Sequence, residues 1–359
     1  MTKNRLGKDP AASQSDVIAL LTDASTFRHN TDNYDVIETN QSYVFLWGRF
    51  AYKLFKAVDS GIRDNTSLQA RYENAMLEME ANQRLAPELY LCVLPIVLKK
   101  DGTLALGKEG DKRPAVDYVV RMRRFDTDNT FYTLLVADKL TRKHIFDLCY
   151  AVGDFHRHQP PATLRNLRGA TAFRTNLEQL VFKRCEVLVG KTITRKQLAD
   201  LRHAAERAIK RRSHALDNRS MQAFRIIHGD MDFGNIVMWR GKPTPFDAAV
   251  LSPLMRHNDV MRDLAYILAP LYMADKLELV KYALEGYMAS TCDNEGMRIL
   301  HLWVGYAAAV RGRSWLYRAQ TAEGMAADER ASLTEQGLRY LEVAIAAFNN
   351  TLPHISPPK

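Results

Sequence analysis

Two patterns of hydrophobic and polar residues divide the chain. Between about Val36 and Arg124, short apolar runs alternate with polar turns, and a single longer amphipathic segment interrupts them. This pattern is typical of β-strands around one helix. After Arg124 the apolar positions recur every three or four residues over long stretches, which is typical of helices. The sequence therefore predicts an α+β fold with a small sheet-containing part and a larger helical part.

The first part is expected to form a sheet with one helix packed on it. Gly48 lies in a turn between two apolar runs, and Pro87 closes the amphipathic segment. The predicted strands are 42–46, 50–55, 90–98 and 116–121, and the predicted helix is 66–86.

The second part is expected to be helical apart from one strand pair between Ile226 and Phe246. Helical periodicity covers 141–158, 173–189, 194–216, 259–273, 276–290, 295–319 and 329–350. Together the patterns predict a flexible lead (1–15), a smaller lobe (16–124), a helical lobe (125–352) and a loose tail (353–359).

Composition fits such a protein, and it excludes fibrous and fully disordered classes. The chain has 359 residues, of which 47% are hydrophobic and 25% charged, enough for two cores. The apolar stretches 263–273 and 300–310 are too short to cross a bilayer, and the N-terminus has no apolar leader. We therefore expect a soluble cytoplasmic protein without a membrane partner. The sequence leaves the oligomeric state open.

The net charge of +9 is concentrated in one segment. Residues 183–225 hold twelve Lys or Arg and four Asp or Glu. Such a segment is either an anion-binding or nucleic-acid-binding face or a solvated helix face. No aromatic residues are interleaved in the basic helix 194–216 to stack on bases. The solvated face is therefore favoured, and nucleic acid is not an expected partner.

The most informative stretch runs from Ile226 to Asp247. Two short apolar runs, 236–238 and 244–246, flank a turn around Gly241 and predict a β-hairpin. Asn235 and Asp247 are each six residues from Gly241, so the hairpin is expected to return both side chains to its open end.

Asp230, five residues before Asn235 on a loop with two glycines, can face the same space as Asn235 and Asp247. Two carboxylates and an amide suit Mg²⁺, which prefers oxygen ligands and retains waters and substrate phosphates. This donor set is what phosphoryl transfer requires.

The spacing also resembles a known family. The run His228-Gly229-Asp230, then Asn235, and Asp247 twelve residues later, resembles the motifs of the aminoglycoside phosphotransferase and choline kinase group, relatives of protein kinases. The segments 38–46, 51–54, 82–91 and 119–122 look like an uncharacterised bacterial branch of that group. Longer members of that branch carry a C-terminal P-loop domain, which we expect this chain to lack.

The resemblance implies a two-lobed, protein-kinase-like fold and a role for each matching residue. Asp230 would be the catalytic residue, and Asn235 and Asp247 would be the metal ligands. Asp263 would steady the catalytic loop, and His228 is expected to brace it by hydrogen bonding rather than to transfer protons.

The smaller lobe would supply the nucleotide-binding groups. Lys53 would contact the nucleotide phosphates and pair with a helix carboxylate. Glu78 is preferred over Glu73 and Glu80, because it shares the helix face of Leu85. Ser42 belongs to the turn 39–42 that would cover the phosphates.

The implied activity is transfer of the γ-phosphoryl group of ATP, with Mg²⁺, to a hydroxyl of a small molecule. GTP is an open alternative, and the acceptor is not readable from the sequence.

Departures from the family keep an alternative open, an inactive nucleotide-binding or interaction module. Val250 stands where relatives commonly have Glu, Asp232 stands where they usually have His, and the turn 39–42 has no glycine. Outside the motif, His144, His156 and His158 are interpreted as surface or helix-cap residues, since no third ligand is spaced to join them.

Overall fold

A computed structural model describes residues 13–27, 34–59, 64–162, 169–220, 222–249 and 257–354. The described chain divides into two compact units. Unit 1 contains the residues up to Thr133, together with Val237–Trp239 and residues 244–249, and unit 2 contains the others. Residues 1–12 of the predicted lead and 355–359 of the predicted tail lie outside the described residues.

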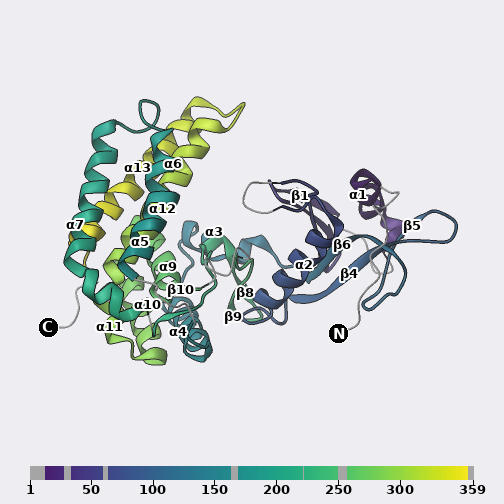
Figure 1. Cartoon of the computed structure of the whole chain (residues 1–359), viewed down its shortest axis with the longest axis horizontal. Coiled ribbons are helices and arrows are strands. Elements are labelled where there is room, and N and C mark those ends of the chain that lie inside the picture. Colours follow the sequence, from purple (N-terminus) through teal and green to yellow (C-terminus); the bar gives the residue numbers. More distant parts are fainter. Residues whose placement is uncertain are drawn as a thin grey trace. The chain divides into compact units, whose positions relative to one another are not determined.

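Unit 1 is built on a six-stranded antiparallel sheet (Figure 1). The strand order is β1-β2-β3-β6-β4-β5. The strands are β1 (Asp35–Glu38), β2 (Ser42–Trp47), β3 (Phe50–Phe55), β4 (Tyr90–Leu98), β5 (Leu104–Leu106) and β6 (Ala115–Arg123). Sequence analysis predicted β2, β3, β4 and β6, and these strands form the centre of the sheet.

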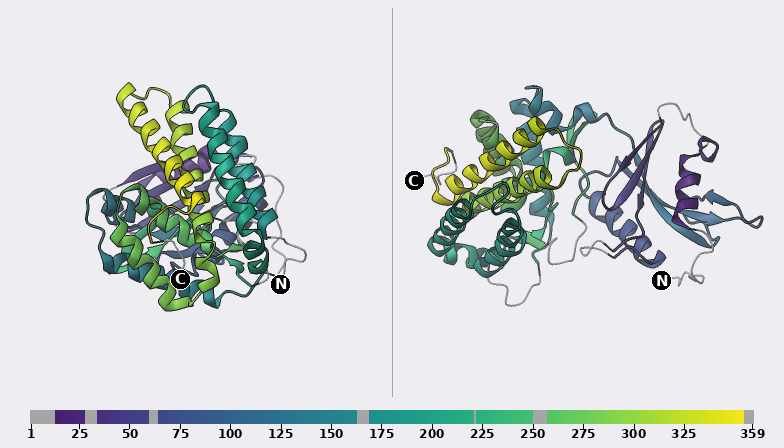
Figure 2. Two further views of the ribbon diagram at one scale, coloured as in Figure 1. Left: turned by 90° about the vertical axis from the view of Figure 1, so that its left-hand side faces the viewer. Right: turned by 90° about the horizontal axis from the view of Figure 1, so that it is seen from above.

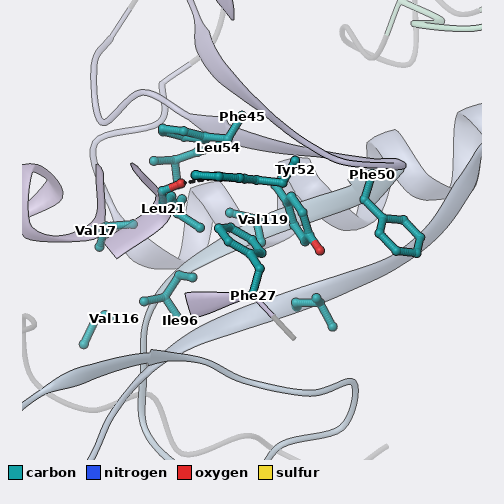
Figure 3. Close-up of a cluster of buried hydrophobic side chains, with 12 residues drawn as sticks. Val17, Leu21, Phe27, Phe45, Phe50, Tyr52, Leu54, Ile96, Val116 and Val119 are labelled. Carbon is teal, nitrogen blue, oxygen red and sulfur yellow. Dashed lines mark hydrogen bonds between the residues drawn. The ribbon is translucent and has the colours of Figure 1, made fainter. Parts of the chain in front are cut away.

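Hydrophobic cores lie on both faces of this sheet, because successive side chains of a strand point to opposite faces. Leu54 and Val119 enter one core, which also holds Leu21 of helix α1 (Gln14–Thr22) (Figure 3). Their neighbours Phe55 and Val120 enter the other core, with Ala75 and Met79 of helix α2 (Leu68–Asn82). Helix α2 therefore packs on the face to which Lys53 points.

Helix α1 was not predicted, and its first residues fall within the predicted flexible lead. Ser13 caps the helix in a reciprocal capping box with Asp16. Val17 and Leu21 are buried, and the indole of Trp47 donates a hydrogen bond of 2.8 Å to the Leu21 carbonyl. The end of the lead is thus ordered by contacts with the sheet.

Unit 2 is mainly helical, and several of its long helices lie side by side (Figure 2). No described helix combines the length and the apolar composition needed to cross a bilayer. The long helices of unit 2 are α4 (Arg142–His158), α5 (Gly169–Leu177), α7 (Arg195–Arg219), α9 (Met261–Met273), α10 (Leu277–Thr291), α12 (Leu300–Thr321) and α13 (Ala327–Asn349).

The shorter elements account for most differences from the sequence prediction. Helix α3 (Phe131–Val136) begins in unit 1 and precedes α4. The predicted helix 173–189 contains a π-helical turn at Glu178–Phe182 before α6 (Lys183–Glu186), and the predicted helix 295–319 is divided into α11 (Asn294–Met297) and α12. Strands β7 (Phe224–Ile226) and β10 (His257–Asp259) form an unpredicted sheet, since three-residue strands are too short to show a periodicity.

The predicted hairpin is present as β8 (Ile236–Trp239) and β9 (Lys242–Pro245). Its turn is tight, because Arg240 and Gly241 both have positive φ, as a two-residue hairpin turn requires. Val237 joins the core under α2, and Trp239 and Phe246 pack against this core. Sequence analysis had placed the hairpin in the helical lobe, but most of it packs in unit 1.

The basic segment of α7 is largely engaged by neighbouring groups. Arg202 pairs with Glu178, and Arg207 donates to the side chain of Asn349. Arg211 donates to the carbonyl of Phe348. The last two contacts place cations at the C-terminal end of α13, where the helix dipole favours positive charge. These contacts give much of the segment a structural role within unit 2.

His301 on α12 makes the folded state sensitive to acid. Burial, and then the neighbouring Arg212 and Arg211, lower the pKa of His301 from 6.5 to about 4. Between these values the unfolded chain binds a proton that the folded chain does not, so stability falls as pH falls. This residue is expected to cost about 2 kcal/mol of unfolding free energy between about pH 7 and pH 5.

Urea unfolding of His301→Gln at the two pH values measures this effect, since the variant should lose that part of the pH dependence. His214→Gln, at an exposed position of α7, is the control. An unaltered pH dependence in His301→Gln would contradict the assignment.

Candidate functional site

Lys53 lies between two carboxylates in unit 1. Its Nζ is 2.8 Å from Glu78 Oε1 and 2.8 Å from Asp247 Oδ1. The Glu78 side chain is 3% exposed, whereas that of Asp247 is 46% exposed. Burial would lower the pKa of Lys53, but Asp247 and Glu78 raise it above its ordinary value. The lysine is therefore a fixed positive charge beside a carboxylate that solvent reaches.

Strand β3, helix α2 and the residues that follow strand β9 bring these side chains together. Side chains alternate between the two faces of β3, and that of Lys53 is on the face that α2 covers. Glu78 lies on the buried face of α2, together with Arg71, Ala75 and Asn82. The other carboxylates that the sequence offered as partners point elsewhere. Glu80 pairs with Arg84 at 2.8 Å, and Glu73 accepts a hydrogen bond from Gln69.

The backbone of Asp247 is held in an uncommon conformation. Its φ is 56°, in the left-handed region that Asp and Asn tolerate better than most residues. Its N–H donates to the hydroxyl of Tyr90 at 3.1 Å, and the next N–H, of Ala248, donates to Asn82 Oδ1 at 2.9 Å. Backbone strain of this kind persists where surrounding contacts impose it, often at functional sites. Sequence analysis missed Asn82 and Tyr90, because their role arises only from long-range contact.

Asp230 and Asn235 are neighbours in unit 2. Asn235 Nδ2 donates to Asp230 Oδ2 at 3.0 Å and to the Asp230 carbonyl at 3.1 Å. The intervening residues form a turn and then a 3-10 helix, Phe233–Asn235. Since Nδ2 faces Asp230, Asn235 Oδ1 points to the other side of the amide. The Asp230 side chain belongs to an exposed residue, whereas Met231 and Phe233 are buried and anchor the loop.

Asp263 holds the start of this loop. Its carboxylate accepts the backbone N–H groups of His228 at 2.7 Å and Gly229 at 2.9 Å. Gly229 has a φ of +81°, which a side chain would disfavour. Arg262 donates to the Gly229 carbonyl at 3.1 Å. His228 is therefore held at the start of the loop, and it is buried, with 2% of its surface exposed.

The prediction that His156 lies at the surface or at a helix cap is wrong. The residue is buried, with Nε2 3.1 Å from Asp263 Oδ2 and Nδ1 3.1 Å from the Tyr287 hydroxyl. Burial would raise the pKa of Asp263, but the hydrogen bond from His156 lowers it below its ordinary value, as does that from the Gly229 N–H. His144 does cap α4, and His158 is exposed.

The turn before β2 is stabilised by hydrogen bonds between its own residues. Ser42 is 3% exposed, and its hydroxyl lies 3.0 Å from Thr39 Oγ1. Thr39 Oγ1 also accepts the Ser42 N–H at 2.9 Å. The Ser42 hydroxyl therefore shapes the turn, and contact of this turn with phosphates stays a prediction. Val250, the departure noted after Asp247, lies outside the described residues.

The structure thus gathers the candidate residues in two groups. Unit 1 brings Lys53, Glu78 and Asp247 together, and unit 2 brings Asp230 and Asn235 together on a loop anchored by Asp263. Within the described residues, no three His, Cys, Asp or Glu side chains gather as a metal site. Asp247 of unit 1 offers a carboxylate oxygen, and Asn235 of unit 2 offers an amide oxygen. Each is the kind of oxygen ligand that Mg²⁺ prefers.

Comparison with known proteins identifies the fold. No protein family model matches the sequence. The solved structure of a choline/ethanolamine kinase family protein from Mesorhizobium loti is similar over 94% of this chain and 99% of its own, with a TM-score of 0.52 and 12% identity. An aminoglycoside phosphotransferase from Alicyclobacillus acidocaldarius is similar over 97% and 98%, with a TM-score of 0.51 and 11% identity.

An amicoumacin kinase in complex with AMP-PNP and Ca²⁺ has a TM-score of 0.51 at 13% identity, over 97% of this chain and 98% of its own. The chain therefore has the protein-kinase-like α+β fold of aminoglycoside phosphotransferases and choline/ethanolamine kinases, and the fold prediction is confirmed.

The relatives found by sequence are longer than this chain. Uncharacterized proteins of Mycobacterium tuberculosis and Mycobacterium bovis are 23% identical over 285 residues, which cover 78% of this chain and 54% of theirs. The chain thus spans about half the length of the curated relatives that it matches. A P-loop domain in the longer relatives stays a prediction.

Proposed function

We propose that this chain is a phosphotransferase that moves the γ-phosphoryl group of ATP, with Mg²⁺, to a hydroxyl of a small molecule. The observation that carries the proposal is Lys53, whose side chain is 13% exposed and contacts Glu78 and Asp247 at 2.8 Å each. A lysine held by a helix carboxylate and by a second, more exposed carboxylate matches the way kinases bind nucleotide phosphates and metal. The complex of the amicoumacin kinase with AMP-PNP and Ca²⁺ supports a nucleotide and a divalent cation for this fold.

Each candidate residue has a role in this proposal. Lys53 binds phosphate oxygens, and Glu78 orients it. Asn235 and Asp247 would hold Mg²⁺, which would supply positive charge beside the phosphates.

Asp230 takes the proton of the acceptor hydroxyl. The hydroxyl oxygen then forms its bond to the γ-phosphorus as the bond from that phosphorus to the bridging oxygen breaks, and ADP leaves. We place this reaction in the cytoplasm, where ATP is abundant. Binding experiments with both nucleotides decide between ATP and GTP as the donor.

Asp247→Ala tests the metal-binding role. Wild-type protein is expected to be stabilised by ATP with Mg²⁺, by about 2.7 kcal/mol at roughly one hundred times the dissociation constant. The variant should lose this Mg²⁺-dependent stabilisation, because the half-exposed carboxylate is removed. Thermal unfolding with ATP alone, Mg²⁺ alone and both measures the effect.

Glu73→Ala is the matched control, since Glu73 is an exposed carboxylate of α2 outside the cluster. An unchanged response of Asp247→Ala to ATP with Mg²⁺ would rule out its metal role. Wild-type binding of ATP without turnover against a broad panel of hydroxyl acceptors would support the alternative, an inactive nucleotide-binding module.

A further inference from the structure

The loop between Asp230 and Asn235 depends on Asp232 for its shape. The N–H of Asp232 donates to the Asp230 carbonyl at 2.7 Å, and the Asn235 N–H donates to the Asp232 carbonyl at 2.8 Å. Asp232 Oδ1 accepts the N–H of Gly234 at 2.8 Å, which caps the short 3-10 helix. Asp232 therefore fixes the path of the chain from the proposed base to the proposed metal ligand.

The second carboxylate oxygen of Asp232 faces Arg311. Asp232 Oδ2 is 2.8 Å from Arg311 Nη2, and the arginine side chain is only 10% exposed. Burial would lower the pKa of Arg311, but Asp232 and other neighbouring groups raise it above its ordinary value. An ion pair with a desolvated partner is less screened than a surface pair, so it restricts the loop more strongly.

Arg311 belongs to a closely packed helix. It lies in the middle of α12, and its guanidinium carbon is 5.9 Å from the centre of the Tyr266 ring of α9. The same α12 helix packs closely on α13, since a Cβ at Gly312 would lie 2.8 Å from the Gly337 carbonyl oxygen. The ion pair thus ties the loop to a helix that cannot easily shift.

The loop is therefore anchored at two separate points. Asp263 and Arg262 of α9 hold His228 and Gly229, just before the loop. Arg311 of α12 holds Asp232, within the loop. Asp232 also adds a negative charge two residues from Asp230, and Arg311 compensates this charge within the unit.

We propose that Arg311 is a positioning residue that sets the geometry of Asp230 and Asn235 through its ion pair with Asp232. The proposal rests on the proposed phosphotransferase function for its kinetic consequence. Its structural consequence, restriction of the loop 230–235, does not depend on that function. Displacing a catalytic group by about 1 Å can cost about 10²-fold in rate.

Kinetics of the full chain test the first consequence. Arg311→Gln is expected to lower kcat for hydrolysis of ATP with Mg²⁺ by about 10²-fold, while KM for ATP changes by less than about threefold. Arg311→Lys, which keeps the charge, should recover part of the loss. The double variant Asp232→Asn with Arg311→Gln should be no slower than the slower single variant, because both remove one interaction. Arg318→Gln, at an exposed position of α12, is the control.

Hydrogen exchange tests the second consequence without any activity. In Arg311→Gln the backbone N–H groups of 232–235 are expected to exchange about tenfold faster, while those of α9 and α12 keep their rates. Faster exchange throughout unit 2, or a lower melting temperature with unchanged kcat and loop exchange, would overturn the proposal. If wild-type protein neither binds nor hydrolyses ATP, the proposed function fails, and loop exchange alone decides the role of Arg311.

Discussion

Replacing Asp230 by Asn is expected to lower kcat for phosphoryl transfer by about 10³-fold, because the variant keeps the shape of the side chain and loses the proton acceptor. The amide can still lie beside Asn235, and the anchorage of the loop by Asp263 does not involve the side chain of Asp230. Binding of ATP with Mg²⁺ should therefore persist, with KM for ATP changed by less than about threefold.

Steady-state ATP turnover with wild-type protein and Asp230→Asn measures this loss. Asp328→Asn, in the exposed first turn of α13, makes the same chemical change far along the chain from the loop. A kcat of Asp230→Asn within about twofold of wild type would exclude Asp230 as the base. A parallel loss of ATP binding would instead indicate that the residue holds metal or nucleotide.

The local arrangement of the candidate site could be predicted where the chain itself imposes it. Spacing along one loop was enough to group Asp230 with Asn235, because a short loop that contains a glycine readily turns back on itself. Helical periodicity was enough to select Glu78, because a residue on the buried face of α2 must meet the sheet. In the first case the two residues in contact are close in sequence. In the second, the position of the residue follows from the regular geometry of the helix.

Apart from the anchorage by Asp263, which the family resemblance implied, the supporting contacts could not be predicted, because they join residues that are far apart in sequence. Asn82 holds the backbone after Asp247 across 166 positions, and His156 reaches Asp263 across 107. Neither residue belongs to a pattern that a single sequence reveals. The same reason applies to β7 and β10, whose pairing depends on two three-residue segments. Sequence analysis therefore found the candidate catalytic and binding groups more readily than the groups that hold them.

Replacing Lys53 by Met is expected to affect both stability and activity, for different physical reasons. The change leaves Glu78, which is 3% exposed, without its ammonium partner, and a buried carboxylate without a counter-charge is costly. We expect a loss of roughly 3 kcal/mol of unfolding free energy. The proposed contact with the nucleotide phosphates would also be lost, so kcat/KM for ATP should fall by about 10²- to 10³-fold.

A second substitution separates these two effects. Adding Glu78→Gln to Lys53→Met removes the buried negative charge, so the double variant should regain much of the stability while its ATP turnover stays low. Urea unfolding and ATP kinetics on the same preparations measure both quantities. Recovery of turnover together with stability would mean that Lys53 acts only as a structural counter-charge. Persistent loss of turnover in a stable double variant is the result expected if the ammonium group itself binds the nucleotide phosphates.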